Sequence, residues 1–325
     1  MYRRSRHGAD VPHAKVPSRR GEDSASDVVA ISSEILVEAP AKVNLHLGVG
    51  FLRPDGYHDV ETVLQTIDLA DRVTLRSSRV FHLSCRPDVG VLARDNLVWR
   101  AAMLFAQRVG REPLVEVELA KAIPTGAGLG GGSSDAAAVI AGLAAFWGVD
   151  QTHVCSEVAA AIGADVPFLL GGGAALFSGR GDVFTRPISA PPLDLVVVKP
   201  SESVSTAAAY AAYDRAPVAA VSPQALIAAC EAGNPERVAA ALSNNMERAA
   251  ISLVPEVAET LAWVRDAQGV LGGSVAGSGS AVFGICVDHS AAELVAREAR
   301  LRGWWSAATV SRGDGVRVLH SKEAL

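Results

Sequence analysis

The sequence predicts an α+β protein of two domains with a ligand-binding cleft between them. Short segments of alternating apolar and polar residues predict half-buried strands, and longer segments rich in alanine and leucine predict helices. Two blocks of this mixed kind lie on either side of a proline-containing break near Pro187. We therefore expect a tail at 1–32 and domains at 33–185 and 186–325, with a ligand in the cleft between the domains.

The composition is that of a globular protein. The chain has 325 residues, of which 49% are hydrophobic and 20% are charged. This balance excludes a chain that is disordered throughout. Beyond residue 32 there are 24 basic and 31 acidic residues, a net charge of −7. A body this acidic is a poor general binder of nucleic acid, so we expect no nucleic-acid partner.

The cysteines and the hydropathy favour a cytoplasmic protein that has no membrane partner. The four cysteines are far apart and none forms a C-x-x-C pair, so neither a zinc site nor a disulfide framework is indicated. A reducing compartment is the simpler assumption. No apolar run reaches the roughly 18 residues that a transmembrane helix needs.

The first 32 residues predict a disordered tail, because they are polar, rich in arginine and serine, and without periodicity. A targeting peptide is the alternative. Four acidic residues and the lack of an apolar core weaken it. Structure is expected to begin near Ser33.

The first domain is expected to begin with strands. These are predicted at 35–37, 43–47, 72–75 and 115–119, with a corner at 39–42 between the first two. A helix at 96–109 is predicted between the last two, with Asp95 as its N-cap and Gly110 as its stop. Helices at 134–147 and 152–163, a turn at 163–167 and a short strand between 173 and 179 follow.

The second domain alternates strands and helices. Strands are predicted at 195–198, at 281–287 and near 315–319. Helices are predicted at 223–232, 235–243, 255–268 and 290–302, with a glycine- and serine-rich turn at 272–280.

The most informative segment is the glycine-rich stretch from Pro124 to Asp135, which leads into an alanine-rich helix. Glycine permits tight turns and close approach of the backbone to a ligand. The first amides of a helix lack intrahelical partners and attract anions. The stretch therefore predicts a phosphate-binding loop. A flexible linker is the alternative, but a linker does not usually run into a helix that opens with Ser-Ser-Asp.

The spacing of this loop differs from that of other phosphate-binding loops. A P-loop needs a lysine directly before its Ser/Thr, where this chain has Gly132. A protein-kinase loop has valine two residues after its last glycine, where this chain has a serine. Gly126, Gly128 and Gly131 fit a dinucleotide-binding spacing, but the loop follows a proline rather than a strand.

Two more segments complete a known set of motifs. Pro40-Ala41-Lys42-Val43-Asn44-Leu45 precedes the glycine loop, and Ala276-Gly277-Ser278-Gly279-Ser280-Ala281 follows it. Over about residues 34–320, the three motifs in this order resemble the GHMP kinase superfamily of small-molecule kinases. The resemblance implies a two-domain α+β fold, with an N-terminal domain like ribosomal protein S5 domain 2 and the active site in the cleft.

Within this superfamily the chain resembles the 4-diphosphocytidyl-2-C-methyl-D-erythritol kinase family. The further marks are Arg53-Pro54-Asp55-Gly56-Tyr57-His58 and Gly163-Ala164-Asp165-Val166-Pro167. The Asp-Gly-Tyr-His element separates this family from its homoserine and mevalonate relatives. Asp135 is a departure, because many members have asparagine there. We expect its side chain to point away from bound phosphates.

The resemblance implies ATP-dependent phosphorylation of the 2-hydroxyl of 4-diphosphocytidyl-2-C-methyl-D-erythritol. The products would be the 2-phosphate and ADP, in the non-mevalonate route to isoprenoid precursors. Asp165 would be the general base, and Lys42 would steady the alkoxide or the γ-phosphate. Without the resemblance, Asp165 reads as a turn-forming residue and Lys42 as a surface lysine.

The resemblance also implies that the glycine loop binds ATP. The expected contacts are Pro124, Gly126, Gly128, Leu129, Gly130, Gly131, Gly132, Ser133 and Ser134. Ser133 or Ser134 could reach Mg²⁺, which takes oxygen ligands, although helix capping is the alternative for both. No motif indicates where the adenine lies.

The implied substrate-binding residues come from four segments. They are Asn44, Tyr57, His58, Thr206, Tyr210, Gly277 and Ser278. Tyr57 and His58 would recognise the cytosine, with packing of a tight hairpin as the alternative. Tyr210 would be a second aromatic residue beside the base, although core packing explains it equally well. The third motif would close over the substrate and support the glycine loop, with a hairpin turn as its alternative.

Three other functions stay open at this point. One is a different GHMP kinase such as homoserine kinase, which the Asp-Gly-Tyr-His element disfavours. A second is a nucleotide-binding module without catalysis, which the presence of Lys42 and Asp165 disfavours. A dinucleotide-dependent oxidoreductase is a more distant third. The partners would be small molecules, and the protein could be a monomer or a homodimer.

Overall fold

The computed structural model describes residues 34–149 and 152–322. The tail predicted at 1–32 lies outside them. The described residues belong to a single unit of the chain, Ile31–Leu325. They form two sheets with helices between and beside them, so the predicted α+β class is confirmed. The larger sheet has the order β12-β1-β2-β4-β3, and the smaller sheet has the order β11-β7-β10-β9.

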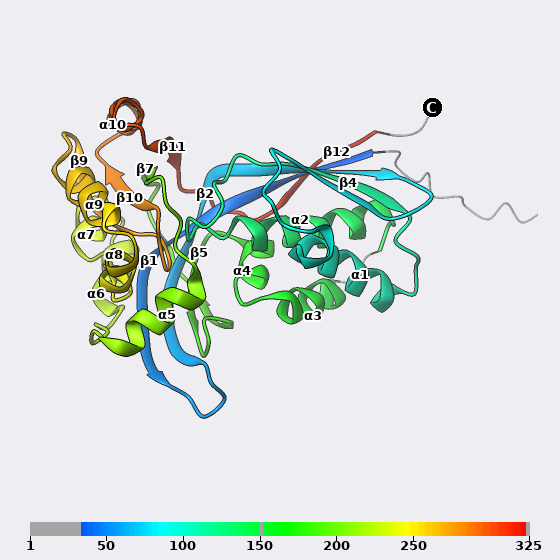
Figure 1. The fold of residues 1–325 in the computed structure, drawn as a ribbon, viewed down its shortest axis with the longest axis horizontal. Helices are drawn as coiled ribbons and strands as arrows, with labels where there is room; N and C mark the ends of the chain where they lie inside the picture. The colour runs from blue at the N-terminus through cyan, green and yellow to red at the C-terminus, as the bar shows by residue number, and fades with distance from the viewer. Residues whose placement is uncertain (1–33, 150–151, 323–325) are drawn as a thin grey trace, which may run out of the picture. The chain divides into compact units, whose positions relative to one another are not determined.

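The first half of the chain forms most of the larger sheet and four α-helices. Its strands are β1 (Glu34–Leu52), β2 (His58–Ser77), β3 (His82–Arg86), β4 (Val115–Ala120), β5 (Ala174–Ser178) and β6 (Val183–Pro187). Its helices are the short 3₁₀ turn η1 (Ala93–Asp95), α1 (Leu97–Val109), α2 (Gly131–Phe146), α3 (Thr152–Ile162) and α4 (Val166–Gly171). Helices α1 to α4 gather on one side of the larger sheet (Figure 1).

The second half of the chain forms the smaller sheet and six α-helices. Its strands are β7 (Asp194–Lys199), β8 (Ser243–Asn244), β9 (Val270–Val275), β10 (Val282–Cys286), β11 (Trp305–Val310) and β12 (Arg317–Lys322). Its helices are α5 (Thr206–Arg215), α6 (Gln224–Glu231), α7 (Pro235–Ala240), α8 (Glu247–Leu253), α9 (Glu256–Asp266) and α10 (His289–Leu301). Strands β8 and β12 both pair with β1 of the larger sheet. The domain boundary at 185/186 stays a prediction.

Four local expectations were wrong, and one of them is the turn predicted at 272–280, whose residues up to Val275 belong to β9. The two strands predicted at 35–37 and 43–47 are one strand, because the expected corner is absorbed as a register shift between Pro40 and Ala41. The N-cap of α1 is Asn96 rather than Asp95, since the Asn96 side chain accepts from the Val98 amide. Helix α2 begins at Gly131, with Gly130 as its left-handed N-cap.

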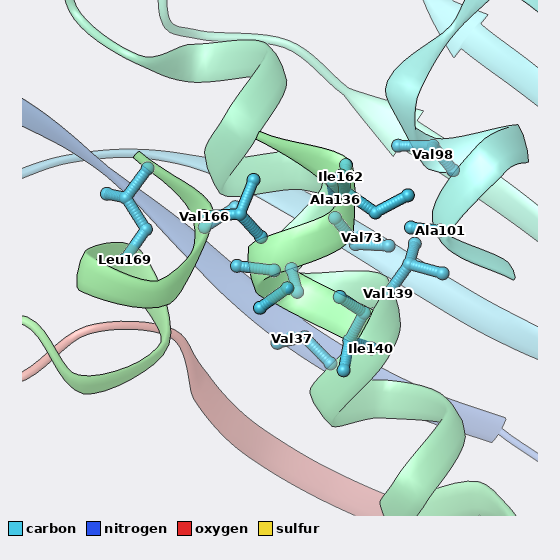
Figure 2. Packing of buried hydrophobic residues seen from close by; sticks show 14 of the residues in the cluster. Val37, Val73, Val98, Ala101, Ala136, Val139, Ile140, Ile162, Val166 and Leu169 are labelled. Atoms are coloured by element: carbon cyan, nitrogen blue, oxygen red, sulfur yellow. The ribbon is translucent and has the colours of Figure 1, made fainter. Parts of the chain in front are cut away.

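Helix α2 is buried because it packs against the larger sheet and against its neighbouring helices. Val139 and Ile140 lie among Val37 and Val73 of the sheet (Figure 2). The helix approaches the sheet so closely that a Cβ at Gly142 would lie 2.6 Å from Leu75 Cδ1. This contact fixes the helix that follows the glycine loop.

The smaller sheet is buried on both faces. Along β7, Val196 and Val198 belong to a core with α9 and α10, while Leu195 and Val197 belong to a core with α6 and α7. The second core also contains Val43 of β1. The smaller sheet is therefore attached to the strand that carries Lys42.

Candidate active site

One cavity of about 550 Å³ brings the three motifs of the sequence together. It is lined by most of the glycine loop, from Pro124 to Ser133, and by Lys42, Asn44 and Asp165. Thr206, Tyr210, Gly277 and Ser278 also line it. Of the site residues predicted from the sequence, Tyr57, His58 and Ser134 are not in its lining.

Lys42 and Asp165 face each other in this cavity. The Lys42 Nζ lies 3.6 Å from Asp165 Oδ2, with the lysine side chain 6% exposed and the aspartate 32% exposed. Asp165 stands at the N-cap of α4, but its carboxylate makes no capping hydrogen bond. The carboxylate is therefore not used to cap the helix. Its ion-pair partner, Lys42, lies on a different element, β1.

A chain of hydrogen bonds holds Lys42 on its strand. Its Nζ donates to Asn44 Oδ1 at 2.9 Å, and Asn44 Nδ2 donates to Thr62 Oγ1 at 2.8 Å. Thr62 Oγ1 in turn donates to the carbonyl of His46 at 2.6 Å. Because residues two apart on a strand share a face, Lys42 and Asn44 point the same way. The Lys42 ammonium is thus positioned by neighbours on β1 and β2.

The third motif packs directly against the glycine loop. Ala281 donates its amide to the carbonyl of Ala127 at 3.2 Å. At Gly128, which has φ +77°, a Cβ would lie 2.0 Å from the carbonyl oxygen of Ala276. The loop is also tied to β1, since the Lys42 amide donates to the carbonyl of Leu129 at 2.9 Å. Only glycine fits at position 128 because the two motifs touch there.

The two serines of the loop differ in their surroundings. Ser133 lines the cavity, whereas Ser134 is fully buried. Within the described part of the chain, the Ser134 hydroxyl has no hydrogen-bond partner. Neither serine caps α2, because the N-cap is Gly130. The capping alternative for these serines is therefore wrong.

Residues of α5 and of the third motif also belong to the cavity wall. The hydroxyls of Thr206 and Ser278 are 3.2 Å apart and can hydrogen-bond. Burial raises the pKa of Tyr210, and the negative charge of Asp165 raises it further. Tyr210 therefore stays protonated at neutral pH, as a neutral ring beside the pair of Lys42 and Asp165.

Tyr57 and His58 stand beside the cavity rather than in its wall. Tyr57 is 54% exposed, and the Arg180 guanidinium lies 4.7 Å from the centre of its ring. His58 is buried, with Nε2 2.7 Å from Asp214 Oδ1 and its ring centroid 5.2 Å from that of Tyr210. Tyr57 contacts Arg180, and His58 contacts Tyr210. Both of these neighbours line the cavity.

Sequence reasoning missed several residues of the cavity wall. The clearest are Arg180, Lys121, Leu97 and Ile123. Leu97 and Ile123 give the glycine-loop end an apolar side, where the sequence offered no motif for adenine. A lysine two residues before the Ile-Pro that opens the loop was a signal, and so was an arginine between two glycines at 179 and 181.

Asp135 turns toward Lys121 rather than toward the cavity. Its Oδ2 lies 2.5 Å from the Lys121 ammonium, and it does not line the cavity. Burial, partly offset by Lys121, raises the pKa of Asp135 to about 7, and the nearby charge of Asp71 adds to the shift. This orientation agrees with the expectation that the side chain points away from bound phosphates.

Comparison with known proteins assigns this architecture. The GHMP kinases N terminal domain matches residues 96–173, and the GHMP kinases C terminal domain matches residues 226–303. The 4-diphosphocytidyl-2-C-methyl-D-erythritol kinase of Nocardia farcinica is 41% identical over 278 residues, covering 82% of this chain and 90% of its own. The chain belongs to the 4-diphosphocytidyl-2-C-methyl-D-erythritol kinase family.

Other members of this kinase family agree. The relative from Pelotomaculum thermopropionicum is 42% identical, covering 81% of this chain and 92% of its own. A crystal structure of 4-(cytidine 5'-diphospho)-2C-methyl-D-erythritol kinase superposes with a TM-score of 0.73 at 35% identity, covering 86% of this chain and all of that one. The predicted GHMP kinase fold is therefore confirmed.

A more distant structure shares the fold alone. The homoserine kinase of Cytophaga hutchinsonii has a TM-score of 0.71 at 21% identity, covering 89% of this chain and 98% of its own. As a member of the 4-diphosphocytidyl-2-C-methyl-D-erythritol kinase family, the chain is a small-molecule kinase that uses ATP. No helix among the described residues is long and apolar enough to cross a membrane.

Proposed function

We propose that this kinase transfers the γ-phosphoryl group of ATP to the 2-hydroxyl of 4-diphosphocytidyl-2-C-methyl-D-erythritol. The products are the 2-phosphate and ADP, in the non-mevalonate route to isoprenoid precursors. The observation that carries the proposal is the pair of Lys42 and Asp165, 3.6 Å apart, in the cavity that the glycine loop lines. Family membership supports the choice of substrate.

Asp165 has the position and the chemistry of a general base. A hydroxyl that approaches its carboxylate loses its proton to an Asp165 oxygen as the bond to phosphorus forms. The Lys42 ammonium stabilises the negative charge that develops on the attacking oxygen and on the transferred group. Because the lysine is already oriented by Asn44, little reorganisation is needed during the reaction.

The glycine loop supplies the ATP site in this proposal. Its backbone amides and the N-terminus of α2 attract the phosphates. Tyr57 and His58 hold the cytosine at the other end, with Asn44, Thr206, Tyr210, Gly277 and Ser278 along the substrate. Stacking of a base on an aromatic ring contributes about 1–3 kcal/mol.

Magnesium fits the oxygen donors at the loop. Mg²⁺ usually takes one or two protein oxygens together with substrate phosphates and water. Ser134 has a fully buried hydroxyl with no partner among the described residues, and Ser133 lines the cavity. One of these hydroxyls would hold the ion, and the ion would supply positive charge that offsets the negative charge of the phosphates. The other expected properties, a cytoplasmic location and a monomeric or homodimeric state, belong to this proposal too.

The test is ADP release by the purified protein with Mg-ATP, using 4-diphosphocytidyl-2-C-methyl-D-erythritol and homoserine as parallel acceptors. The proposal expects release only with the cytidine substrate. Release with homoserine would keep the fold and overturn the substrate. ATP binding without release from either acceptor would overturn the catalytic proposal.

A further inference from the structure

A buried cluster of three charged side chains connects the two ends of the glycine loop. Lys121 precedes the loop, Asp135 lies on α2 just beyond its first turn, and Asp71 lies on β2. The Lys121 ammonium forms ion pairs with both carboxylates. The side chains of Lys121, Asp71 and Asp135 are only 7%, 0% and 4% exposed.

Asp71 also holds the backbone that enters the loop. Its Oδ1 accepts hydrogen bonds from the amides of Ala122 at 2.6 Å and Ile123 at 2.8 Å, while its Oδ2 accepts from Lys121. Hydrogen bonds to an ionised carboxylate are stronger than those between neutral groups. Asp71 therefore fixes both the side chain of Lys121 and the segment that leads to Pro124.

The two ends of the loop lie against each other at this cluster. A Cβ at Gly131 would lie 3.0 Å from Ile123 Cγ2 and 3.5 Å from Lys121 Nζ. Lys121 and Ile123 line the cavity, whereas Asp71 and Asp135 do not. The ammonium thus stands between the loop and the two carboxylates, and it joins residue 121 to residue 135.

Stability alone does not account for such a cluster. Burying each ion costs several kcal/mol in desolvation, and apolar residues of similar volume often serve stability as well or better. The cluster instead lies where the two ends of the loop come together. Amides that stabilise phosphate charge act best when they are oriented before the ligand arrives.

We propose that Asp71, Lys121 and Asp135 are positioning residues that hold the ends of the glycine loop and so aim its amides at the phosphates of ATP. The proposal rests on the proposed ATP site of this kinase. It also gives Asp135 a role, because its carboxylate binds Lys121 instead of competing with phosphate. An asparagine at this position could accept from Lys121 through its side-chain oxygen.

The experiment measures ADP binding by calorimetry, which needs no acceptor substrate, on the wild-type protein, Asp135→Ala, Asp135→Asn and Lys121→Met. Asp135→Ala removes the ion pair with Lys121 and is expected to weaken ADP binding about tenfold, since small displacements of positioned groups have large effects. Asp135→Asn should restore wild-type affinity, and Lys121→Met should lose at least as much as Asp135→Ala. In steady-state assays the KM for ATP should rise in Asp135→Ala while the KM for the cytidine substrate stays unchanged.

Arg312→Met is the matched control. Arg312 is a cation of similar burial, 5% exposed, that forms ion pairs with Glu38, Asp68 and Asp314, and it does not line the cavity. This variant should lower the melting temperature and leave ADP affinity unchanged. If Lys121→Met does not fold, Asp135→Ala carries the test alone.

Unchanged or tighter ADP binding by Asp135→Ala would overturn the proposal. Tighter binding would mean that a released Lys121 binds phosphate itself and that the cluster does not position the loop. The outcomes are separable from the proposed function. A wild-type protein that binds ADP but does not phosphorylate the cytidine substrate contradicts the function alone. If the wild-type protein phosphorylates the cytidine substrate and Asp135→Ala binds ADP with wild-type affinity, only the positioning role of the cluster is contradicted.

Discussion

The two ends of the cavity are built in different ways. At the phosphate end, Lys42 and Lys121 are buried, and the glycine loop is bonded to β1 and to the third motif. Beside the other end, Tyr57 is 54% exposed on the turn between β1 and β2, and the Arg180 guanidinium, from the turn between β5 and β6, lies over its ring. Groups that stabilise developing charge act best when they are held rigidly away from water. A nucleobase, in contrast, can be recognised by aromatic rings on exposed turns.

This comparison predicts that variants at the phosphate end reduce turnover and that variants at the exposed end change substrate affinity. The largest effect should come from Asp165→Asn or Lys42→Met. Removing a general base typically costs about 10²–10⁴-fold in rate, and the 32% exposed Asp165 side chain makes no capping bond. We therefore expect kcat to collapse in Asp165→Asn with its melting temperature retained. Turnover near that of the wild type would remove Asp165 from the mechanism.

Gly128→Ala should break the phosphate end by separating the glycine loop from the third motif. The new Cβ would lie 2.0 Å from the Ala276 carbonyl in a backbone of φ +77°. Overpacking of this kind costs about 1–3 kcal/mol, measurable as a lower free energy of unfolding together with weaker ADP binding. Gly171→Ala is the control, since nothing lies within 4 Å of its Cβ. Equal behaviour of the two variants would show that the contact is unimportant.

His46 is a buried residue outside the cavity lining, and its titration should affect the stability of the protein rather than turnover or substrate affinity. Burial lowers its pKa from 6.5 to about 4. Between pH 6.5 and 4 the unfolded chain therefore binds more protons, and the free energy of unfolding should fall as the pH falls. The contribution is at most about 3 kcal/mol. Denaturant unfolding at several pH values should show that the free energy of unfolding depends less on pH in His46→Gln. An unchanged dependence would contradict the assignment of this effect to His46.

Tyr57→Ala should have the smallest effect and the most selective one. Loss of base stacking costs about 1–3 kcal/mol, so the KM for the cytidine substrate should rise about tenfold while the KM for ATP stays near its wild-type value. Phe51→Ala, which removes a ring that is 91% exposed on the same hairpin, should change neither constant. A larger rise in the KM for ATP than for the cytidine substrate would reject stacking on Tyr57.

Local patterns in the sequence predicted the phosphate end better than the rest of the site. The glycine loop, Lys42, Asn44 and Asp165 were recognisable because each belongs to a short motif, and the structure brings them into one cavity. The helices at α9 and α10 were also predicted, since their apolar periodicity is local. Strand β1 was split in the prediction because a proline within it suggested a corner, while pairing with β2 keeps the strand continuous.

Contacts between distant segments could not be predicted from the sequence. Asp71 meets Lys121 and Asp135 only because β2 pairs with β4 and α2 packs on both β1 and β2. Arg180 reaches Tyr57 through the turn between β5 and β6, a hairpin that was only half predicted. The local signals at Lys121 and Arg180 do not show which residues they contact, because tertiary packing creates these contacts.

The claim that the two ends of the cavity bind different nucleotides is tested most directly by hydrogen exchange. The free protein is compared with the protein bound to ADP and with the protein bound to CDP. The account predicts that ADP slows exchange at 124–132 and leaves 53–58 unchanged, and that CDP slows exchange at 53–58. Protection of 124–132 by CDP with no change at 53–58 would contradict it, because the exposed end would then have no part in recognising the nucleotide.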